Sequence, residues 1–131
     1  MSRTDESEPT VQTLFSLEGR TALVTGAAGY LGAQISRALS EAGASVIATS
    51  RDEARAERLV AALPRTNRQR HLAIAMDHLD ESSIQTAFRD AVASSGQVDI
   101  VVNNGHAASP SDWTTVSHEE FTRQMANAAG Y

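Results

Sequence analysis

The stretch of sequence that decides the fold is Thr25-Gly26-Ala27-Ala28-Gly29-Tyr30-Leu31-Gly32. An apolar run, residues 22–24, precedes it, and a pattern with helical periodicity follows it. The stretch therefore predicts the end of a strand, a glycine-rich turn and the start of a helix. Such a turn directs unpaired backbone N–H groups and the positive end of a helix dipole at one point, where the pyrophosphate of a dinucleotide can bind.

The glycine spacing supports this interpretation. Gly26, Gly29 and Gly32 are spaced Gly-x-x-Gly-x-x-Gly, whereas the common dinucleotide fingerprint is Gly-x-Gly-x-x-Gly. Both spacings allow a tight turn, close approach of the backbone to phosphate, and close packing of helix on strand. The strand before the turn and the helix after it favour dinucleotide binding over a plain strand-to-helix turn.

Short apolar runs alternate with helical patterns along the rest of the chain. Further strands are predicted at residues 46–48, 72–76 and 100–102. This alternation is typical of β-α units, so the predicted fold class is α/β: a Rossmann-like, doubly wound parallel sheet, incomplete, with about four strands in the order 3-2-1-4. The glycine turn and Asn103-Asn104 would then meet at the crevice where the winding reverses.

Two helical patterns carry more detailed predictions. The helix after the glycine turn is expected to bury a stripe made of Leu31, Ile35, Ala38, Leu39 and Ala42. Ser50 and Glu53, three residues apart, resemble a capping box that opens the next helix. Later helices are expected to start at Asp80 and at Ser117.

Length and composition suggest one partial domain and exclude several classes of protein. We expect residues 1–18 to form a flexible N-terminal tail and residues 19–131 a partial Rossmann dinucleotide-binding domain. The net charge of −5 argues against a nucleic-acid partner, and no apolar run reaches the length of a membrane span. The start of the chain has no apolar signal region, so a cytoplasmic location is expected.

Residue types that are absent narrow the chemistry further. The chain has no Cys, which excludes disulfides and cysteine nucleophiles within it. Its four His show no ligand-like spacing, so no metal is expected. All 11 basic residues are Arg, and there is no Lys.

Three motifs resemble the short-chain dehydrogenase/reductase family, and the resemblance covers residues 19–131. The glycine turn is similar to the family's Thr-Gly-x-x-x-Gly-x-Gly, with Tyr30 where the middle Gly is usual. Asp77 resembles the acidic residue that contacts the adenine in the family. The segment from Asn103 to His106 is similar to the family's Asn-Asn-Ala-Gly, although its last two residues differ.

The resemblance implies an NAD(P)-dependent oxidoreductase that transfers hydride between a nicotinamide cofactor and a carbonyl or alcohol substrate. It also implies a set of cofactor-binding residues: Gly26, Ala28, Gly29, Tyr30, Leu31, Gly32, Ser50, Arg51, Asp77, His78, Asn103 and Gly105.

The choice of cofactor is expected to depend on the end of the second strand, which reads Ser50-Arg51. A neutral residue followed by Arg favours NADP(H) over NAD(H), because Arg can accept the 2′-phosphate. Asp52 comes next, and a shift of two residues would favour NAD. Arg51 as a solvated charge at a helix start and Asp77 as an ordinary turn residue are the alternatives.

The chemistry implied by the family is incomplete in these residues. Family members use a Ser and a Tyr-x-x-x-Lys pair, in which the Lys lowers the pKa of the Tyr. Without Lys that pair cannot exist here, so the chain alone is predicted to be inactive. Asn127 is the nearest match to an Asn that supports the active site in the family. The alternatives are that Ala128 occupies the equivalent position, or that Asn127 is an ordinary polar helix residue.

Three interpretations follow for the whole chain. The favoured one is the cofactor-binding part of a truncated oxidoreductase, because the last helix lacks a stop signal. The others are a non-catalytic NADP-binding or sensory module, and a chain completed by a partner or as a homo-oligomer. Residues 100–102 would leave an unpaired sheet edge, which makes an isolated monomer marginal.

Overall fold

The structure, a computed structural model, describes residues 8–66, 68–106, 112 and 114–129. Within those ranges, no helix is both long enough and apolar enough to cross a membrane. The elements are α1 Val11–Leu14, β1 Thr21–Val24, α2 Tyr30–Glu41, β2 Ser45–Ser50, α3 Glu53–Ala62, β3 Leu72–Ala75, α4 Glu81–Ser95, β4 Ile100–Val102 and α5 His118–Ala129.

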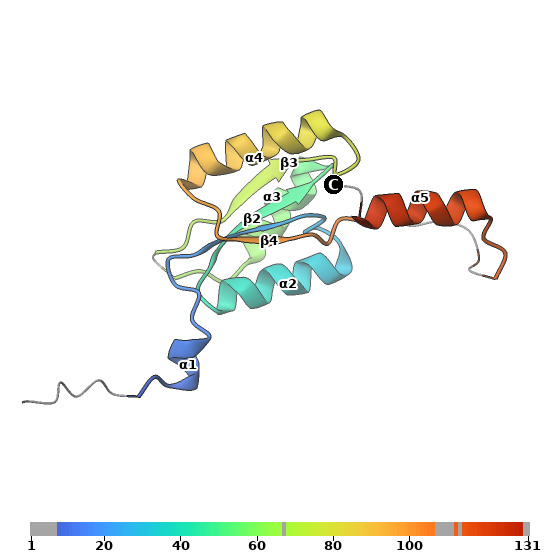
Figure 1. The fold of residues 1–131 in the computed structure, drawn as a ribbon. Helices are drawn as coiled ribbons and strands as arrows, with labels where there is room; N and C mark the ends of the chain where they lie inside the picture. Colours follow the sequence, from blue (N-terminus) through green and yellow to red (C-terminus); the bar gives the residue numbers. More distant parts are fainter. Residues whose placement is uncertain (1–7, 67, 107–111, 113, 130–131) are drawn as a thin grey trace, which may run out of the picture.

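The four strands form one parallel sheet in the order β3-β2-β1-β4, as predicted (Figure 1). The chain moves outward from β1 through β2 to β3 and then returns to place β4 on the other side of β1. The winding direction therefore reverses between β1 and β4, which is where open α/β sheets bind ligands. The incomplete Rossmann α/β class is confirmed.

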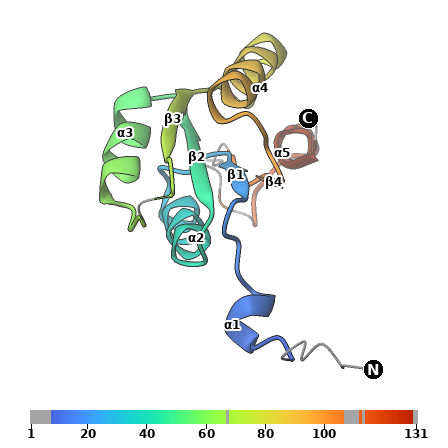
Figure 2. The ribbon, with the colours of Figure 1, turned by 90° about the vertical axis from the view of Figure 1, so that its left-hand side faces the viewer.

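Helices cover both faces of the sheet, so its central strands β1 and β2 are buried along most of their length. Val24, Val46 and Ala48 pack in one cluster with residues of α3. Leu23 and Ile47 point to the other face, where they pack with Ala91 of α4. Figure 2 shows α2 and α3 on one side of the sheet and α4 on the other. The two clusters hold the strand ends in fixed positions.

The predicted apolar stripe of α2 is only partly correct, because Ile35, Leu39 and Ala42 are half-buried while Leu31 and Ala38 are exposed. The residues that α2 buries are Gly32, Ser36 and Ser40, whereas Leu31 is 62% exposed. Small side chains on this face let the helix lie close to the strands, so backbone proximity outweighs apolar area in setting the rotation of the helix. Leu39 is the member of the predicted stripe that packs against the core cluster.

The start of α3 also differs from the prediction. The N-cap is Asp52, whose Oδ1 accepts a hydrogen bond from the backbone N of Arg55 at 3.4 Å. Ser50 ends β2, and its hydroxyl accepts a hydrogen bond from the backbone N of Asp52 at 3.2 Å. Ser50 and Glu53 therefore form no capping box. The other two predicted helix starts are confirmed by side-chain caps at Asp80 and Ser117.

The N-terminal segment contains a short helix that the sequence did not predict. Val11, Leu14 and Phe15 in and after α1 are each at least 65% exposed, and the segment projects away from the sheet (Figure 1). The backbone N of Leu17 donates to the carbonyl of Ala42 at 2.8 Å, which ties the end of this segment to the end of α2. The division of the chain at residue 18 stays a prediction.

A buried imidazole joins three segments at the amino end of the sheet. Nδ1 of His71 accepts a hydrogen bond from the backbone N of Val46 at 3.0 Å, so that nitrogen carries no proton. Nε2 then carries the proton and lies 3.0 Å from the carbonyl oxygen of Pro64. Burial lowers the pKa of His71 below 6.5, against an opposing effect of the Pro64 carbonyl and with a smaller lowering by Arg65. The neutral ring is thus part of the fold.

The stability of the domain should depend on the ionisation of His71. Because its pKa is lower in the folded chain than the unfolded value of 6.5, its contribution is complete above 6.5 and is lost as the pH falls through the folded value. The free energy of unfolding, measured with urea, should be lower at about pH 5 than at about pH 7. The substitution His71→Gln should make this difference smaller. The matched control, His118→Gln on exposed α5, should retain the full fall. Identical pH dependence in wild type and His71→Gln would contradict this role.

Candidate functional site

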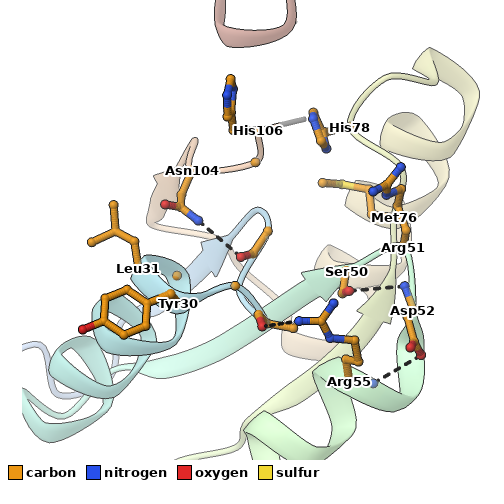
Figure 3. Close-up of a pocket in the computed structure, with 15 residues that line it drawn as sticks. Tyr30, Leu31, Ser50, Arg51, Asp52, Arg55, Met76, His78, Asn104 and His106 are labelled. Carbon is orange, nitrogen blue, oxygen red and sulfur yellow. Dashed lines mark hydrogen bonds between the residues drawn. The ribbon is translucent and has the colours of Figure 1, made fainter. Parts of the chain in front are cut away.

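A cleft of about 790 Å³ lies at the carboxyl ends of all four strands (Figure 3). Its position matches the reversal point of the sheet, where a ligand is expected. The residues that line it are Gly26, Ala28, Gly29, Tyr30, Leu31, Gly32, Ser50, Arg51, Asp52, Arg55, Met76, His78, Asn104, Gly105 and His106.

The glycine turn approaches β4 and α2 more closely than any side chain would allow. Gly26 has a φ of +60°, and a Cβ there would lie 2.9 Å from the Cα of Gly105. A Cβ on Gly32 would lie 2.4 Å from the carbonyl oxygen of Gly26. These two positions therefore require glycine for conformation and for space respectively. The result is a floor of bare backbone under the cleft.

The N-terminus of α2 faces this floor without a cap of its own. Its N-cap is Gly29, which provides no side-chain hydrogen bond, and its first turn contains no acidic residue. In contrast, α3 and α4 are capped by the carboxylates of Asp52 and Asp80. The first-turn N–H groups of α2 have no acceptor within the helix, and the helix dipole adds positive potential. The arrangement suits an anionic group such as a pyrophosphate.

Asn104 and Thr25 hold the glycine turn against β4. The side-chain Nδ2 of Asn104 donates to the carbonyl oxygens of Thr25, at 3.1 Å, and Gly26, at 3.2 Å. The Thr25 hydroxyl accepts from the backbone N of Asn104 at 2.9 Å and of Gly105 at 2.7 Å. The two strand ends that flank the reversal point are therefore joined by side chains as well as by the sheet.

The far end of the cleft is formed by the end of β2 and the start of α3. Arg51, Asp52 and Arg55 are all exposed there. Nη2 of Arg55 donates to the carbonyl oxygen of Ala28 at 3.1 Å. The ion pairs found among the described residues are Arg20–Asp99, Arg37–Glu41 and Arg123–Glu120, so neither Arg51 nor Arg55 has a carboxylate partner within the described chain.

The third wall comes from the end of β3. Met76 is buried beneath the cleft, and His78 lines it. Nε2 of His78 is buried and has no hydrogen-bond partner among the described residues. A Cβ on Gly105 would lie 3.1 Å from Cγ of the His78 ring, so the backbone of Gly105 and the imidazole are in close contact.

Most of the predicted cofactor-binding residues line the cleft, and two do not. Asp77 is a turn residue whose Oδ1 accepts from the backbone N of Leu79 at 3.0 Å. Asn103 is exposed beside the cleft, and its neighbour Asn104 lines it instead. Asn127 lies in α5, and its side chain is outside the described part of the structure, so its predicted catalytic role is not placed relative to the cleft.

The prediction missed Asp52, Arg55, Met76, Asn104 and His106 as lining residues. Asn104 and His106 lay within a motif that was already recognised, and Met76 was the last residue of a predicted strand. The positions of Asp52 and Arg55 at the cleft depend on the start of α3 at Glu53, because residues three apart at the start of a helix lie on the same face. Placing that start correctly would have identified both.

Comparison with known proteins gives one family. A family model described as short chain dehydrogenase matches residues 20–129. The chain is 34% identical over 123 residues to D-threitol dehydrogenase of Mycolicibacterium smegmatis, covering 94% of this chain and 47% of that protein. It is 30% identical over 107 residues to L-fucose dehydrogenase of Bos taurus, covering 82% and 38%.

Solved structures agree with these matches. The 3-ketoacyl-(acyl-carrier-protein) reductase of Brucella melitensis, crystallised as a complex with NADH, superposes with a TM-score of 0.70 at 34% identity, covering 86% of this chain and 45% of that one. A dehydrogenase/reductase of Sinorhizobium meliloti superposes with a TM-score of 0.75 at 32% identity, covering 88% and 46%. The chain thus spans less than half the length of each of these four proteins.

Asn104 should contribute more to stability than its neighbour in the same motif. Asn104→Ala removes both hydrogen bonds to the glycine turn and leaves two partly buried carbonyl groups without them, so it should lower the unfolding free energy by about 1–3 kcal/mol. Asn103→Ala, at an exposed position, is the control and should change it by less than about 0.5 kcal/mol. Chemical denaturation measures both, and equal effects would show that Asn104 does not hold the turn.

Proposed function

Because the chain belongs to the short-chain dehydrogenase family, we propose that it binds a nicotinamide dinucleotide in the cleft. The observation that carries the proposal is the N-terminus of α2 at Gly29, which has no side-chain cap and leaves first-turn backbone N–H groups available to a phosphate. The pyrophosphate would lie over the glycine turn, with the backbone N–H groups of Tyr30, Leu31 and Gly32 as its donors.

The remaining predicted contacts fit around that position. Ala28 and Gly29 would border the pyrophosphate, and Ser50 and Arg51 would border the adenosine ribose. His78 and Gly105 would form the wall of the cleft between the adenine and the middle of the cofactor. Support for the fit comes from the bare backbone at Gly26 and Gly32, where a Cβ would collide with the backbone of Gly105 and with that of the turn, respectively. Contacts from Asp77 to the adenine and from Asn103 stay predictions, because neither residue lines the cleft.

We infer that the complete protein is an oxidoreductase acting on a carbonyl or alcohol group. The relatives are named dehydrogenases and reductases, two of them for sugar or sugar-alcohol substrates. A bound nicotinamide ring would accept or supply the hydride. These 131 residues contribute binding and orientation of the cofactor, and without Lys they contain no Tyr-x-x-x-Lys pair, so we propose that they do not catalyse on their own. A supporting role for Asn127 belongs to the same proposal.

NADP(H) is the proposed cofactor in preference to NAD(H). Arg51 follows β2 directly, lines the cleft and has no carboxylate partner among the described residues. Asp52, the acidic neighbour that could bind the 2′-hydroxyl of NAD, already accepts a hydrogen bond as the N-cap of α3. A guanidinium directly after the strand, without a carboxylate partner among the described residues, favours the 2′-phosphate.

The wider predictions extend this proposal. Cytoplasmic location, the absence of nucleic-acid and membrane partners, and assembly into a homo-oligomer stay predictions. The open edge of β4, where Val101 is 52% exposed, supports the last of them, because β4 pairs with β1 alone among the described strands.

Titration of the purified chain tests the proposed cofactor. Saturable binding of NADPH is expected, with NADH at least about tenfold weaker, the effect of one charge-assisted contact. Arg51→Ala should weaken NADPH binding and leave NADH binding within about twofold. Arg58→Ala, on an exposed part of α3 that does not line the cleft, should change neither. The absence of saturable binding for both nucleotides would overturn the proposed function.

A further inference from the structure

Asn104 and Gly105 together form a dipeptide that can modify itself chemically. The backbone N of a glycine can attack the side-chain amide carbon of an Asn before it, because glycine has no Cβ to hinder ring closure. Gly105 N would lose its proton to a base from the solvent and bond to Cγ of Asn104. The bond from Cγ to Nδ2 then breaks, and Nδ2 leaves as ammonia with a proton from water. Water opens the resulting cyclic imide to give Asp or isoaspartate.

The glycine turn holds both reacting groups of this dipeptide. Gly105 N donates its proton to the hydroxyl oxygen of Thr25 at 2.7 Å. Nδ2 of Asn104 donates to the carbonyl oxygens of Thr25 and Gly26, so the amide points toward the turn (Figure 3). The nucleophile keeps its proton and the amide is fixed by two hydrogen bonds. Ring closure therefore requires these bonds to break.

Packing restricts the Asn104 side chain further. Asn104 is partly buried, and its Nδ2 lies between the two glycines that let α2 approach the turn. A Cβ would lie 2.8 Å from Nδ2 if built on Gly32 and 3.4 Å from it if built on Gly26. Rotation of the amide toward Gly105 N thus requires the turn to move away from β4. The reactive conformation belongs to a locally opened state of the chain.

Either product of the reaction is incompatible with the closed contact. An Asp at position 104 has no N–H donor, and its carboxylate would face the carbonyl oxygens of Thr25 and Gly26, which are acceptors as well. Isoaspartate adds a methylene group to the backbone before Gly105 and would displace its N from the Thr25 hydroxyl. The opened state would therefore become permanent.

We propose that Asn104 is a deamidation site, which the contact between the glycine turn and β4 protects, and that its conversion to Asp or isoaspartate abolishes this contact. The motif of the family has Ala in place of Gly105, so the reactive pair arises from a departure of this chain from that motif. The reaction involves the chain and water alone, so the inference stands independently of any nucleotide in the cleft.

The rate of deamidation in the folded and unfolded chain tests the protection. Trypsin releases residues 90–123 as one peptide, in which mass spectrometry with fragmentation identifies Asp and isoaspartate at position 104. At one pH, the folded chain should react at least about tenfold more slowly than the chain in concentrated urea, because opening breaks several hydrogen bonds. In urea, Gly105→Ala should react more slowly than the wild type. Equal rates in the folded and unfolded wild type would overturn the inference.

Substitutions at Thr25 test which bonds give the protection. Thr25→Val removes the acceptor of Gly105 N and should accelerate deamidation of the folded chain by about fivefold, the effect of about one net hydrogen bond. Thr25→Ser keeps the hydroxyl and should stay within about twofold of the wild type. A folded Thr25→Val with the wild-type rate would contradict the proposal. If circular dichroism shows that Thr25→Val is unfolded, the comparison of folded and unfolded wild type decides.

The effect of the product is tested by Asn104→Asp. Its thermal unfolding midpoint should fall well below that of Asn103→Asp, the matched control at an exposed position with the same change of charge. Failure of Asn104→Asp alone to fold would be the same result in a stronger form. Equal midpoints for the two variants would show that the product is tolerated, and would overturn the claim that deamidation abolishes the contact.

Discussion

The close contact between the glycine turn and β4 is the constraint on which the site depends. Asn104 donates to the carbonyls of Thr25 and Gly26, and the Thr25 hydroxyl accepts from two backbone N–H groups in return. These bonds fix the direction in which α2 starts, and Gly32 lets the helix lie against the turn. The free N–H groups of α2 point into the cleft because the helix entry is held at both strand ends.

The sequence was sufficient for the parts of the fold that local patterns determine. The strand order followed from the alternation of apolar runs and helices, since crossover handedness leaves few arrangements. The rotation of α2 did not follow, because Gly32, Ser36 and Ser40 are buried for their small size. Arg55 was missed for a related reason: its place in the cleft depends on where α3 begins, and Ser50 and Asp52 are both plausible caps by residue type.

Departures from the family motifs have local physical explanations. Gly105 stands where the family has Ala, and a Cβ there would lie 3.1 Å from the His78 ring, so an Ala at this position would require a small shift of the imidazole. Tyr30 stands where the middle Gly is usual, and its side chain is 92% exposed, so it leaves the backbone of the turn accessible. Neither change closes the cleft. The positive charge at its far end is supplied by Arg51 and Arg55 in a chain that contains no Lys.

The most direct test of the account is a crystal structure of the chain with NADP⁺ bound. We predict that the pyrophosphate lies at the N-terminus of α2 and accepts hydrogen bonds from the backbone N–H groups of residues 30–32, with the 2′-phosphate within hydrogen-bond distance of Arg51. Pyrophosphate density elsewhere on the protein, with the N-terminus of α2 occupied only by water, would contradict the account.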